Sequence, residues 1–404
     1  MKTKRVIAIG GGAAGFFAAI NCKLLNPSFE VKILDKTNKL LSKVLVSGGG
    51  RCNVTHHCFD NKQLVKNYPR GEKELMQVFS RFAVYDTIHW FKEHDIELKV
   101  EADGRMFPVS NKSETIANCF LDLVKKLHIE VITQCEVQKI IKKETFELHT
   151  SKGNFETEVL ICSMGGNNKM EGYKILKELG HNIISPIPSL FTLNLPAENI
   201  KKELQGVAVQ NATVTIEKTK FNYTGPVLVT HWGLSGPAVL KLSAFAAPHF
   251  FETDYKNNIL INWTGNLKLN EIIEKLNDQK INSSRSIIIK TPLFELPKRL
   301  WEFLVVKAGI VSDTNWPNVS KQHIHKLSEI LFRDVYKMEG KTTFKEEFVT
   351  AGGIDLKEID FKTMQSKRVK DLYFCGEVLN IDGITGGFNF QSAWSTAYVC
   401  ASSI

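Results

Sequence analysis

The segment "VSGGGRCNVTHH", residues 46–57, brings together residue types that can bind a cofactor or carry out chemistry. Three consecutive glycines, Gly48, Gly49 and Gly50, can cradle a phosphate, lie against a flat ring, or simply form a flexible loop. Cys52 is either a small buried residue packed beside a ligand, half of a redox pair, or a proton donor. A thiol with an ordinary pKa of about 8.5 is protonated at neutral pH, which suits the last role.

A glycine pattern at the N-terminus predicts a dinucleotide site. Gly10, Gly12 and Gly15 follow a short apolar run and open an apolar helical stretch, which is the setting of the G-x-G-x-x-G fingerprint. The N–H groups at the start of that helix would bind a pyrophosphate. A second strand ends in Asp35, where a ribose needs an acceptor, and a glycine turn without a ligand leaves this residue unexplained. The residues expected here to bind the cofactor are Gly10, Gly12, Ala13, Ala14, Gly15, Asp35 and Lys36.

NAD and FAD share this fingerprint, and the C-terminal residues favour FAD. A buried strand over residues 372–375 ends in Gly376 and Glu377, and a glycine-rich loop and an apolar helix from about Phe390 follow. Glu377 would accept from ribitol hydroxyls, and the helix N-terminus would face the flavin or the phosphates. A nucleotide fold split between both chain ends is typical of FAD enzymes of the glutathione-reductase type. The residues expected here to bind the cofactor are Gly376, Glu377, Gly386, Gly387, Asn389, Phe390 and Gln391.

Several motifs resemble those of the BaiN/RdsA-like (YhiN-type) family of NAD(P)/FAD-dependent oxidoreductases. They are "KVLVSGGGRCNVT", "GRMFPVS", "THWGLSGPAVL", "FVTAGGIDLKEIDFKTMQSK" and "LYFCGEVLNIDGITGGFNFQSAW", and they span nearly the whole chain in the family's order. The resemblance implies an α/β fold with a discontinuous Rossmann-like FAD-binding domain and inserted β-barrel-like and small helical domains. The chain departs from the family pattern at Asn380, Ala397 and Ala401, and its loop after Gly166 is shorter.

The resemblance also implies an activity. Members reduce activated C=C bonds with a flavin, either in bile-acid enones or in a uridine of large-subunit ribosomal RNA, which becomes dihydrouridine. We expect hydride to pass from NAD(P)H through FAD to such a bond. Because the chain has no second G-x-G-x-x-G, NAD(P)H must reach the flavin without a Rossmann domain of its own. The alternatives are a reductase or oxidase of a small enone or amine, and a non-catalytic flavin-bearing RNA-binding protein.

The remaining candidate residues have two interpretations each. Arg51 is expected to anchor the glycine loop by pairing with a phosphate or a carboxylate. Lys43 is either a solvated charge or a cofactor contact, and His231 is either a substrate contact or a buried hydrogen-bonding residue. The other residues expected to contact FAD are Asn53, Thr55, Val137 and Gly165.

Redox-dithiol and metal chemistry are disfavoured at this loop. Cys52 and Cys58 have C-x5-C spacing instead of the C-x4-C of disulfide reductases of similar fold, and no C-terminal His–Glu dyad is present. The neighbouring His56 and His57 would point to opposite sides of an extended chain, and nothing completes a set of four ligands. We therefore expect no metal site.

Composition and charge narrow the class of protein. The chain has 404 residues, and no apolar run reaches the 18 or so residues of a membrane span. The apolar stretch near the N-terminus is too short for a signal peptide, so a buried strand is expected. Eight cysteines without framework spacing indicate reduced thiols in the cytoplasm. Residues 190–345 carry 20 Lys/Arg and 14 Asp/Glu, and this net charge of +6 permits an RNA partner.

The hydrophobic pattern divides the chain into segments. Residues 1–187 and 349–404 are expected to form the two parts of the FAD-binding domain. Residues 188–267 alternate like short strands and are assigned to the β-barrel-like domain, with 341–348 as a candidate to return to it. Residues 268–340 are amphipathic and Lys-rich, which favours a helical domain.

Overall fold

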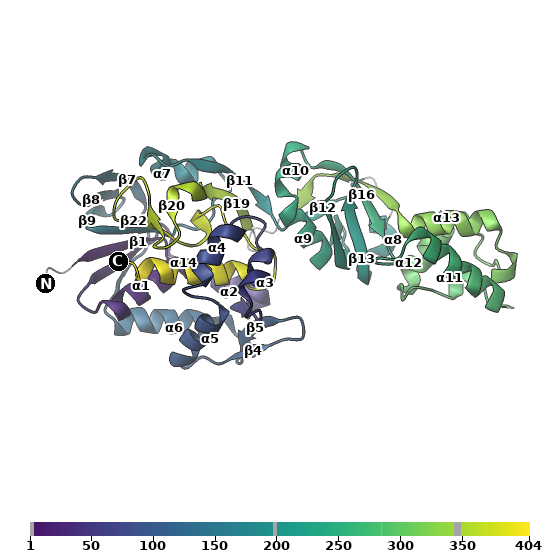
Figure 1. The fold of residues 1–404 in the computed structure, drawn as a ribbon, viewed down its shortest axis with the longest axis horizontal. Helices are drawn as coiled ribbons and strands as arrows, with labels where there is room; N and C mark the ends of the chain where they lie inside the picture. Colours follow the sequence, from purple (N-terminus) through teal and green to yellow (C-terminus); the bar gives the residue numbers. More distant parts are fainter. Residues whose placement is uncertain (1–3, 197–199, 284, 343–348) are drawn as a thin grey trace. The chain divides into compact units, whose positions relative to one another are not determined.

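The computed structural model describes residues 4–196, 200–283, 285–342 and 349–404. The chain divides into two compact units (Figure 1). The first unit consists of residues 1–188 and 345–404, and the second consists of residues 189–344. Residues 343–348, which include most of the segment expected to return to the β domain, lie outside the described residues.

A seven-stranded sheet in the order β20-β21-β22-β10-β1-β2-β6 is the centre of the first unit. Strands β22, β10, β1, β2 and β6 run parallel, and β20 and β21 pair antiparallel at one edge. The inner strands are apolar on both faces, as expected of a parallel sheet covered by helices. The strands are β1 (Arg5–Ile9), β2 (Glu30–Leu34), β6 (Glu130–Ile132), β10 (Val159–Cys162), β20 (Ile359–Asp360), β21 (Gln365–Ser366) and β22 (Leu372–Phe374).

Helix α1 (Ala13–Leu25) packs against α14 (Phe388–Ala401) and α6 (Ser113–Lys126), so the two ends of the chain share one core. Phe17 is the aromatic centre of this core, with ring centroids 5.3 Å from Trp394 and 4.5 Å from Trp90. Helix α14 begins at Phe388, two residues before the expected start at Phe390. The other helices of this unit are α2 (Ser42–Gly50), α3 (Asn61–Leu64), α4 (Glu72–Phe79), α5 (Val84–Glu93) and α7 (Lys174–Glu178).

Smaller sheets complete the first unit. One has the order β3-β5-β4, a second the order β7-β8-β9, and a third pairs β11 with β19. Their bounds are β3 (Thr55–His56), β4 (Leu98–Val100), β5 (Arg105–Pro108), β7 (Val137–Lys142), β8 (Phe146–Thr150), β9 (Gly153–Thr157), β11 (Ile183–Ser189) and β19 (Val349–Ile354).

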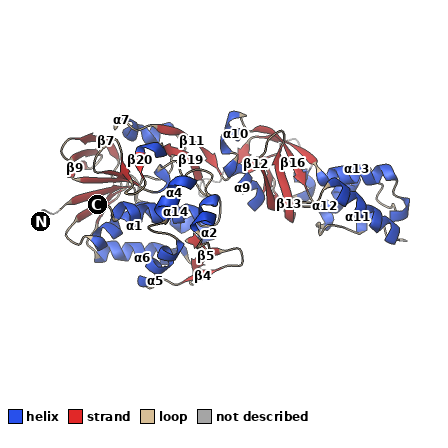
Figure 2. Ribbon diagram, viewed as in Figure 1, coloured by secondary structure: helices blue, strands red, loops and turns tan. Residues whose placement is uncertain are grey.

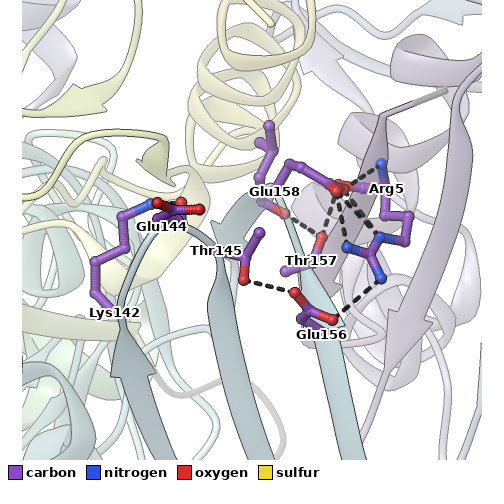
Figure 3. A network of polar contacts seen from close by, with 8 residues as sticks. Arg5, Lys142, Glu144, Thr145, Glu156, Thr157 and Glu158 are labelled. Atoms are coloured by element: carbon purple, nitrogen blue, oxygen red, sulfur yellow. Dashed lines mark hydrogen bonds and ion pairs between the residues drawn. The ribbon is translucent and has the colours of Figure 1, made fainter. Parts of the chain in front are cut away.

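Arg5 joins the β7-β8-β9 sheet to the central sheet (Figure 3). Its Nη2 lies 2.7 Å from Oε1 of Glu158, and its Nη1 lies 3.5 Å from Oε2 of Glu156. The Thr157 hydroxyl donates to the Arg5 carbonyl at 2.7 Å. The hydrogen bonds from Arg5 lower the pKa of Glu158 to about 2, so this carboxylate is charged at neutral pH.

The second unit is built on an antiparallel sheet in the order β17-β16-β13-β14-β15-β12-β18. Helix α9 packs on β14 and β13 (Figure 2). The strands are β12 (Thr192–Asn194), β13 (Ala208–Ile216), β14 (Asn222–Val229), β15 (Gly233–Ser235), β16 (Lys256–Asn262), β17 (Asp334–Glu339) and β18 (Lys341–Thr342). The helices are α8 (Ile200–Leu204), α9 (Pro237–Phe245), α10 (Ala247–Glu252), α11 (Leu269–Asn282), α12 (Lys298–Lys307) and α13 (Lys321–Phe332).

Two segments of the second unit differ from the expected secondary structure. Residues 237–252 lie within the range expected to form strands, yet they form α9 and α10. Pro237 starts α9 in the first helical position, where its missing N–H costs nothing. Residues 334–339 lie within the range expected to be helical, yet they form β17, whose alternating burial matches a strand paired with β16.

Asp334 connects helix α12 to this sheet. Its buried carboxylate accepts from Nζ of Lys307 at 2.6 Å, from Nε1 of Trp263 at 3.0 Å and from the hydroxyl of Tyr336. A buried carboxylate with three donors is compensated for the loss of its hydration.

Throughout the described ranges, every helix is too short or too polar to cross a membrane.

Candidate cofactor and active site

The turn from β1 into α1 depends on the absence of side chains. Gly10 has φ +112°, and a Cβ there would lie 2.4 Å from the Ser163 carbonyl oxygen. A Cβ at Gly15 would lie 1.9 Å from the Gly10 carbonyl oxygen. A Cβ at Gly12, by contrast, would meet nothing within 4 Å. Gly12 is also the N-cap of α1, so the first-turn N–H groups of Ala13, Ala14 and Gly15 have no acceptor within the helix and face this opening.

Asp35 follows β2 and holds this turn in place. Its Oδ2 accepts from the Gly11 N–H at 2.7 Å, and its Oδ1 accepts from the N–H and hydroxyl of Thr37 at 2.7 and 2.8 Å. The carboxylate thus lies at the end of β2 beside the glycine turn, where a ribose acceptor is expected. Lys36, next to it, is exposed.

The C-terminal residues Gly376 and Glu377 lie close to the same turn. Gly376 has φ +74°, and a Cβ there would lie 2.6 Å from Cβ of Ala14 in α1. Oε2 of Glu377 forms an ion pair with Nζ of Lys43, and Oε1 accepts from the Thr350 N–H at 3.2 Å. Lys43 is therefore joined to the C-terminal segment, which the sequence alone does not indicate.

The three glycines at the end of α2 form a loop, because the helix is kinked at residues 47–49, and they adopt a backbone that other residues avoid. The φ angles of Gly48, Gly49 and Gly50 are +58°, +69° and +79°, in the left-handed region. A Cβ on Gly49 or Gly50 would meet nothing within 4 Å, and both residues are exposed. The loop therefore presents bare backbone to a space outside the protein core.

Arg51 anchors this loop to the protein. Its Nη1 lies 2.5 Å from Oε1 of Glu101, and its guanidinium carbon lies 3.9 Å from the centre of the Phe107 ring. Of the two expected partners, the structure places a carboxylate beside Arg51. The Arg51 side chain thus links the glycine loop to Phe107 in β5.

Cys52 lies beneath the loop with no exposed surface. Burial raises the pKa of its thiol to about 12, although a hydrogen bond with Ser47 lowers it in part. Cys52 and Cys58 are both free thiols. A fully buried thiol with such a pKa favours the packing interpretation over a redox pair or a proton donor.

The residues after Cys52 bind the C-terminal helix. The amide of Asn53 lies 2.9 Å from the Gly387 nitrogen and 3.0 Å from the Thr55 carbonyl oxygen. The Thr55 hydroxyl donates to Oε1 of Gln391 at 2.5 Å. Nε2 of Gln391 donates to the hydroxyls of Thr87 and Ser395 at 2.9 and 2.8 Å. Asn53, Thr55 and Gln391, expected as cofactor contacts, thus hold the protein together around the glycine loops.

Four further candidates have distinct positions. Asn389 closes the C-terminal loop by bonding both the N–H and the carbonyl of Gly383, at 2.8 and 2.9 Å. Phe390 stacks on Trp394 with centroids 5.5 Å apart. Gly165 has φ +72° and open space at its Cβ position. Val137 is the first residue of β7 and is half-buried.

His231 lies in the second unit, between β14 and β15. It is exposed, and its ring centroid is 4.6 Å from that of Trp232. The interpretation of His231 as a buried hydrogen-bonding residue is therefore wrong, because the turn after β14 carries it to the surface.

Sequence reasoning missed several residues of this region. Asp382 is fully buried and pairs with Arg70 through two hydrogen bonds. Among the described residues, the Thr350 hydroxyl is a buried polar group with no hydrogen-bond partner, and it lies beside Glu377. The segment "NYPRG" contains Arg70 and has a Pro-Arg-Gly sequence typical of a turn. No pattern in the sequence around Thr350 indicates a buried polar group.

In residues 4–196, 200–283, 285–342 and 349–404, no group of three or more His, Cys, Asp or Glu side chains is arranged to hold a metal ion.

The family described as the HI0933-like protein Rossmann domain matches residues 4–403. The chain belongs to this HI0933-like family. This confirms the resemblance drawn from the motifs, and it confirms a Rossmann-type α/β fold. The structure of 3-ketosteroid delta1-dehydrogenase from Sterolibacterium denitrificans shares the fold, with a TM-score of 0.53 at 11% identity over 100% of this chain and 99% of that chain.

Named relatives of this HI0933-like chain are enzymes. A protein of Haemophilus influenzae named ribosomal RNA dihydrouridine synthase is 31% identical, covering 98% of both chains. A protein of Clostridium scindens named 3-dehydro-bile acid delta(4,6)-reductase is 22% identical, covering 98% of this chain and 97% of the relative. The chain is thus an enzyme of an oxidoreductase family.

Proposed function

We propose that this chain is an FAD-dependent oxidoreductase that uses NAD(P)H to reduce an activated carbon–carbon double bond, with a uridine of large-subunit ribosomal RNA as the acceptor. The observation that carries the proposal is the meeting of both chain ends at the first turn of α1, where Gly376 lies against Ala14. One extended ligand can then be bound by the N-terminal glycine turn and by the Gly376–Glu377 segment together.

The residues of this region fit FAD. The opening at Gly12, together with the first-turn N–H groups of α1, suits a pyrophosphate, and the Asp35 carboxylate suits a ribose. The bare backbone of Gly49 and Gly165 suits a flat ring that approaches closely. The Thr350 hydroxyl lacks a protein partner, and a ligand beside Glu377 would supply one.

The residues that we propose to hold FAD are those of the glycine segments and their neighbours. They are Gly10, Gly12, Ala13, Ala14, Gly15, Asp35, Lys43, Gly48, Gly49, Gly50, Val137, Gly165, Gly376, Glu377, Gly386 and Gly387. Arg51, Asn53, Thr55, Asn389 and Gln391 are proposed to shape the site, because each makes contacts within the protein.

When bound, FAD supplies the capacity to accept a hydride from NAD(P)H and to deliver it to one carbon of the double bond, and a proton from water completes the reduction at the other carbon. The chain's own contribution is electrostatic and steric. Backbone N–H groups of the glycine loops can donate to a substrate carbonyl as negative charge develops on it. Cys52 keeps its proton under the loop and supports the backbone of the glycines before it.

Two observations favour the RNA acceptor. The named relative that acts on ribosomal RNA is 31% identical, against 22% for the bile-acid reductase. The excess of Lys and Arg in residues 190–345 suits phosphate contacts. We propose that the exposed side chain of His231 contacts this substrate. We also propose that the enzyme is cytoplasmic, because its RNA acceptor would be found there. The second candidate is a small enone, which the similarity to the bile-acid reductase favours.

Incubation of the purified protein with NAD(P)H and unmodified large-subunit ribosomal RNA tests the acceptor. We expect dihydrouridine, detected by mass spectrometry of nuclease digests, at one position and only when NAD(P)H is present. An enone such as a 3-keto-4-ene steroid serves as the competing substrate in a parallel reaction. Enone turnover without dihydrouridine would select the second candidate, and turnover of neither by a reducible flavoprotein would contradict both.

A further inference from the structure

The loop before α14, residues 382–387, has little conformational restraint of its own. Gly386 and Gly387 have φ angles of +128° and +94°, and Gly383 adds a third glycine. Glycine-rich backbone loses more entropy on ordering than other sequences. The ordered conformation of this C-terminal loop must therefore be imposed by its neighbours.

Residues 67–71, the supporting segment, contact the C-terminal loop and its flanks along their length. The Ile384 N–H donates to the Asn67 carbonyl at 2.9 Å. The Tyr68 hydroxyl donates to the Phe388 carbonyl at 2.7 Å. At the far end, a Cβ on Gly71 would lie 2.6 Å from Cγ1 of Ile381.

The strongest contact between them is the ion pair of Arg70 with Asp382. Nε and Nη2 of Arg70 bond the two carboxylate oxygens of Asp382, in the paired geometry that arginine makes with carboxylates. The side chain of Asp382 is 0% exposed and that of Arg70 is 16% exposed. The backbones of the two residues also form an isolated antiparallel bridge. A buried pair of this geometry tolerates little displacement, because either charge alone would be uncompensated.

The opposite face of the loop is bound by the residues after Cys52. Nδ1 of His56 lies 3.0 Å from the Gly386 carbonyl oxygen, and the Asn53 amide lies 2.9 Å from the Gly387 nitrogen. The loop is thus held at Gly386 and Gly387 by one N-terminal segment and at Asp382 by another. Loss of the contact at Asp382 would remove one of these restraints and leave the bonds at Gly383, Ile384, Gly386 and Gly387.

We propose that Arg70 is a positioning residue for the cofactor: through Asp382 it fixes the loop whose Gly386 and Gly387 backbone lies against FAD. This inference rests on the proposed function, since it assumes that FAD occupies the site. In this role Arg70 acts on the loop through Asp382.

Two variants test this role without leaving a buried charge alone. Arg70→Lys keeps a cation beside Asp382 but loses the two-point geometry. The double variant Arg70→Met with Asp382→Asn removes both charges. Arg333→Met is the matched control, because Arg333 pairs with Glu217 on the surface of the second unit. Circular dichroism establishes which variants are folded.

The measurements are the FAD dissociation constant, the visible spectrum of the bound flavin, and amide hydrogen exchange of residues 382–387 in cofactor-free protein. In folded variants we expect the dissociation constant to rise about tenfold, as when residues that orient metal ligands are removed. The spectrum should shift and loop exchange should quicken, whereas Arg333→Met should match the wild type. Wild-type affinity, spectrum and exchange in folded Arg70→Lys and in the double variant would overturn the proposal. A wild-type protein that binds no FAD would instead overturn the proposed function, and this inference with it.

Discussion

The hydroxyl of Thr55 donates to Oε1 of Gln391 at 2.5 Å, although the two residues are 336 positions apart in the chain. This buried bond links the segment after the glycine loop to the first turns of α14. Gln391 also donates to Thr87 and Ser395, so both N–H groups of its side-chain amide are used. The N-terminal and C-terminal glycine loops are therefore held in register by the protein itself, before any cofactor binds.

The substitution Gln391→Leu tests this link. It would leave the hydroxyl of Thr55 without its partner in a buried site, at a cost of about 1–3 kcal/mol, whereas the Thr87 hydroxyl still donates to the Ala83 carbonyl at 3.1 Å. We expect a clear loss in the free energy of unfolding, measured with urea on the cofactor-free protein. Thr55→Val combined with Gln391→Leu should be less destabilising than the sum of the two single changes. Strict additivity would show that the bond is not formed.

Two glycines of the fingerprint should respond differently to the same substitution. In Gly15→Ala the new Cβ would lie 1.9 Å from the Gly10 carbonyl oxygen, so the packing of α1 on β1 must shift. We expect a loss of about 1–3 kcal/mol or more in stability, as for other overpacked sites. Thermal unfolding without FAD measures this loss.

Gly12→Ala is the matched control, because its Cβ would meet nothing within 4 Å. It should lose much less stability than Gly15→Ala, because only the N-cap of α1 becomes less favourable, but it should bind FAD more weakly, since the methyl group enters the space assigned to the pyrophosphate. Equal destabilisation by both variants would contradict the difference between the two positions. Unchanged FAD affinity in Gly12→Ala would contradict the assigned phosphate position.

The buried pair of His181 and Glu358 predicts a loss of stability in mild acid. Nδ1 of His181 lies 2.9 Å from Oε2 of Glu358, and Nε2 lies 3.1 Å from the Ser366 hydroxyl. Burial lowers the pKa of His181 below its usual 6.5, although Glu358 opposes this shift. The folded state therefore resists protonation, and stability falls as the pH drops below about 6.5.

The pKa of Glu358 adds to this trend. Burial alone would raise it, but hydrogen bonds from Asn182, His181 and Arg368 hold it below its usual value. Its contribution is present above its unfolded pKa and is lost at more acidic pH. We expect the unfolding temperature to fall between pH 7.5 and pH 5.5, and to fall less in His181→Gln. If the unfolding temperature of His181→Gln depends on pH as strongly as that of the wild type, another group is responsible for the loss of stability.

Cysteine labelling separates the interpretations of Cys52. Because its thiol is buried and has a pKa of about 12, we expect no reaction with iodoacetamide in the folded protein. Cys58, which is half-buried, is the internal comparison and should react first. Mass spectrometry of digests locates the label. Rapid modification of Cys52 in the folded protein would return it to consideration as a redox or acid–base group.

Local signals in the sequence could be interpreted directly. Gly10 and Gly15 were predictable, because the β1–α1 turn leaves no room for a side chain at either position, and Asp35 was predictable at the end of β2 beside that turn. The fold class followed from the same signals at both chain ends.

Partner choice between distant segments could not be predicted in this way. Lys43 pairs with Glu377, and Arg51 pairs with Glu101, because the fold brings them together across long stretches of chain. In the second unit, α9 begins at Pro237 in an apolar, alanine-rich stretch whose pattern does not distinguish helix from strand. The burial of Asp382 likewise depends on Arg70, 312 residues away.

We expect the two chain ends, where they meet, to bind an FAD that NAD(P)H can reduce. The most direct measurement is the visible spectrum of the purified protein, reconstituted with FAD if it is purified without it, before and after anaerobic addition of NAD(P)H. We predict a yellow protein with bound-flavin absorbance that is bleached by NAD(P)H, and weaker binding in Gly12→Ala. A folded protein that is colourless after incubation with excess FAD and removal of the unbound FAD, or a bound flavin that NAD(P)H leaves oxidised, would contradict this proposal.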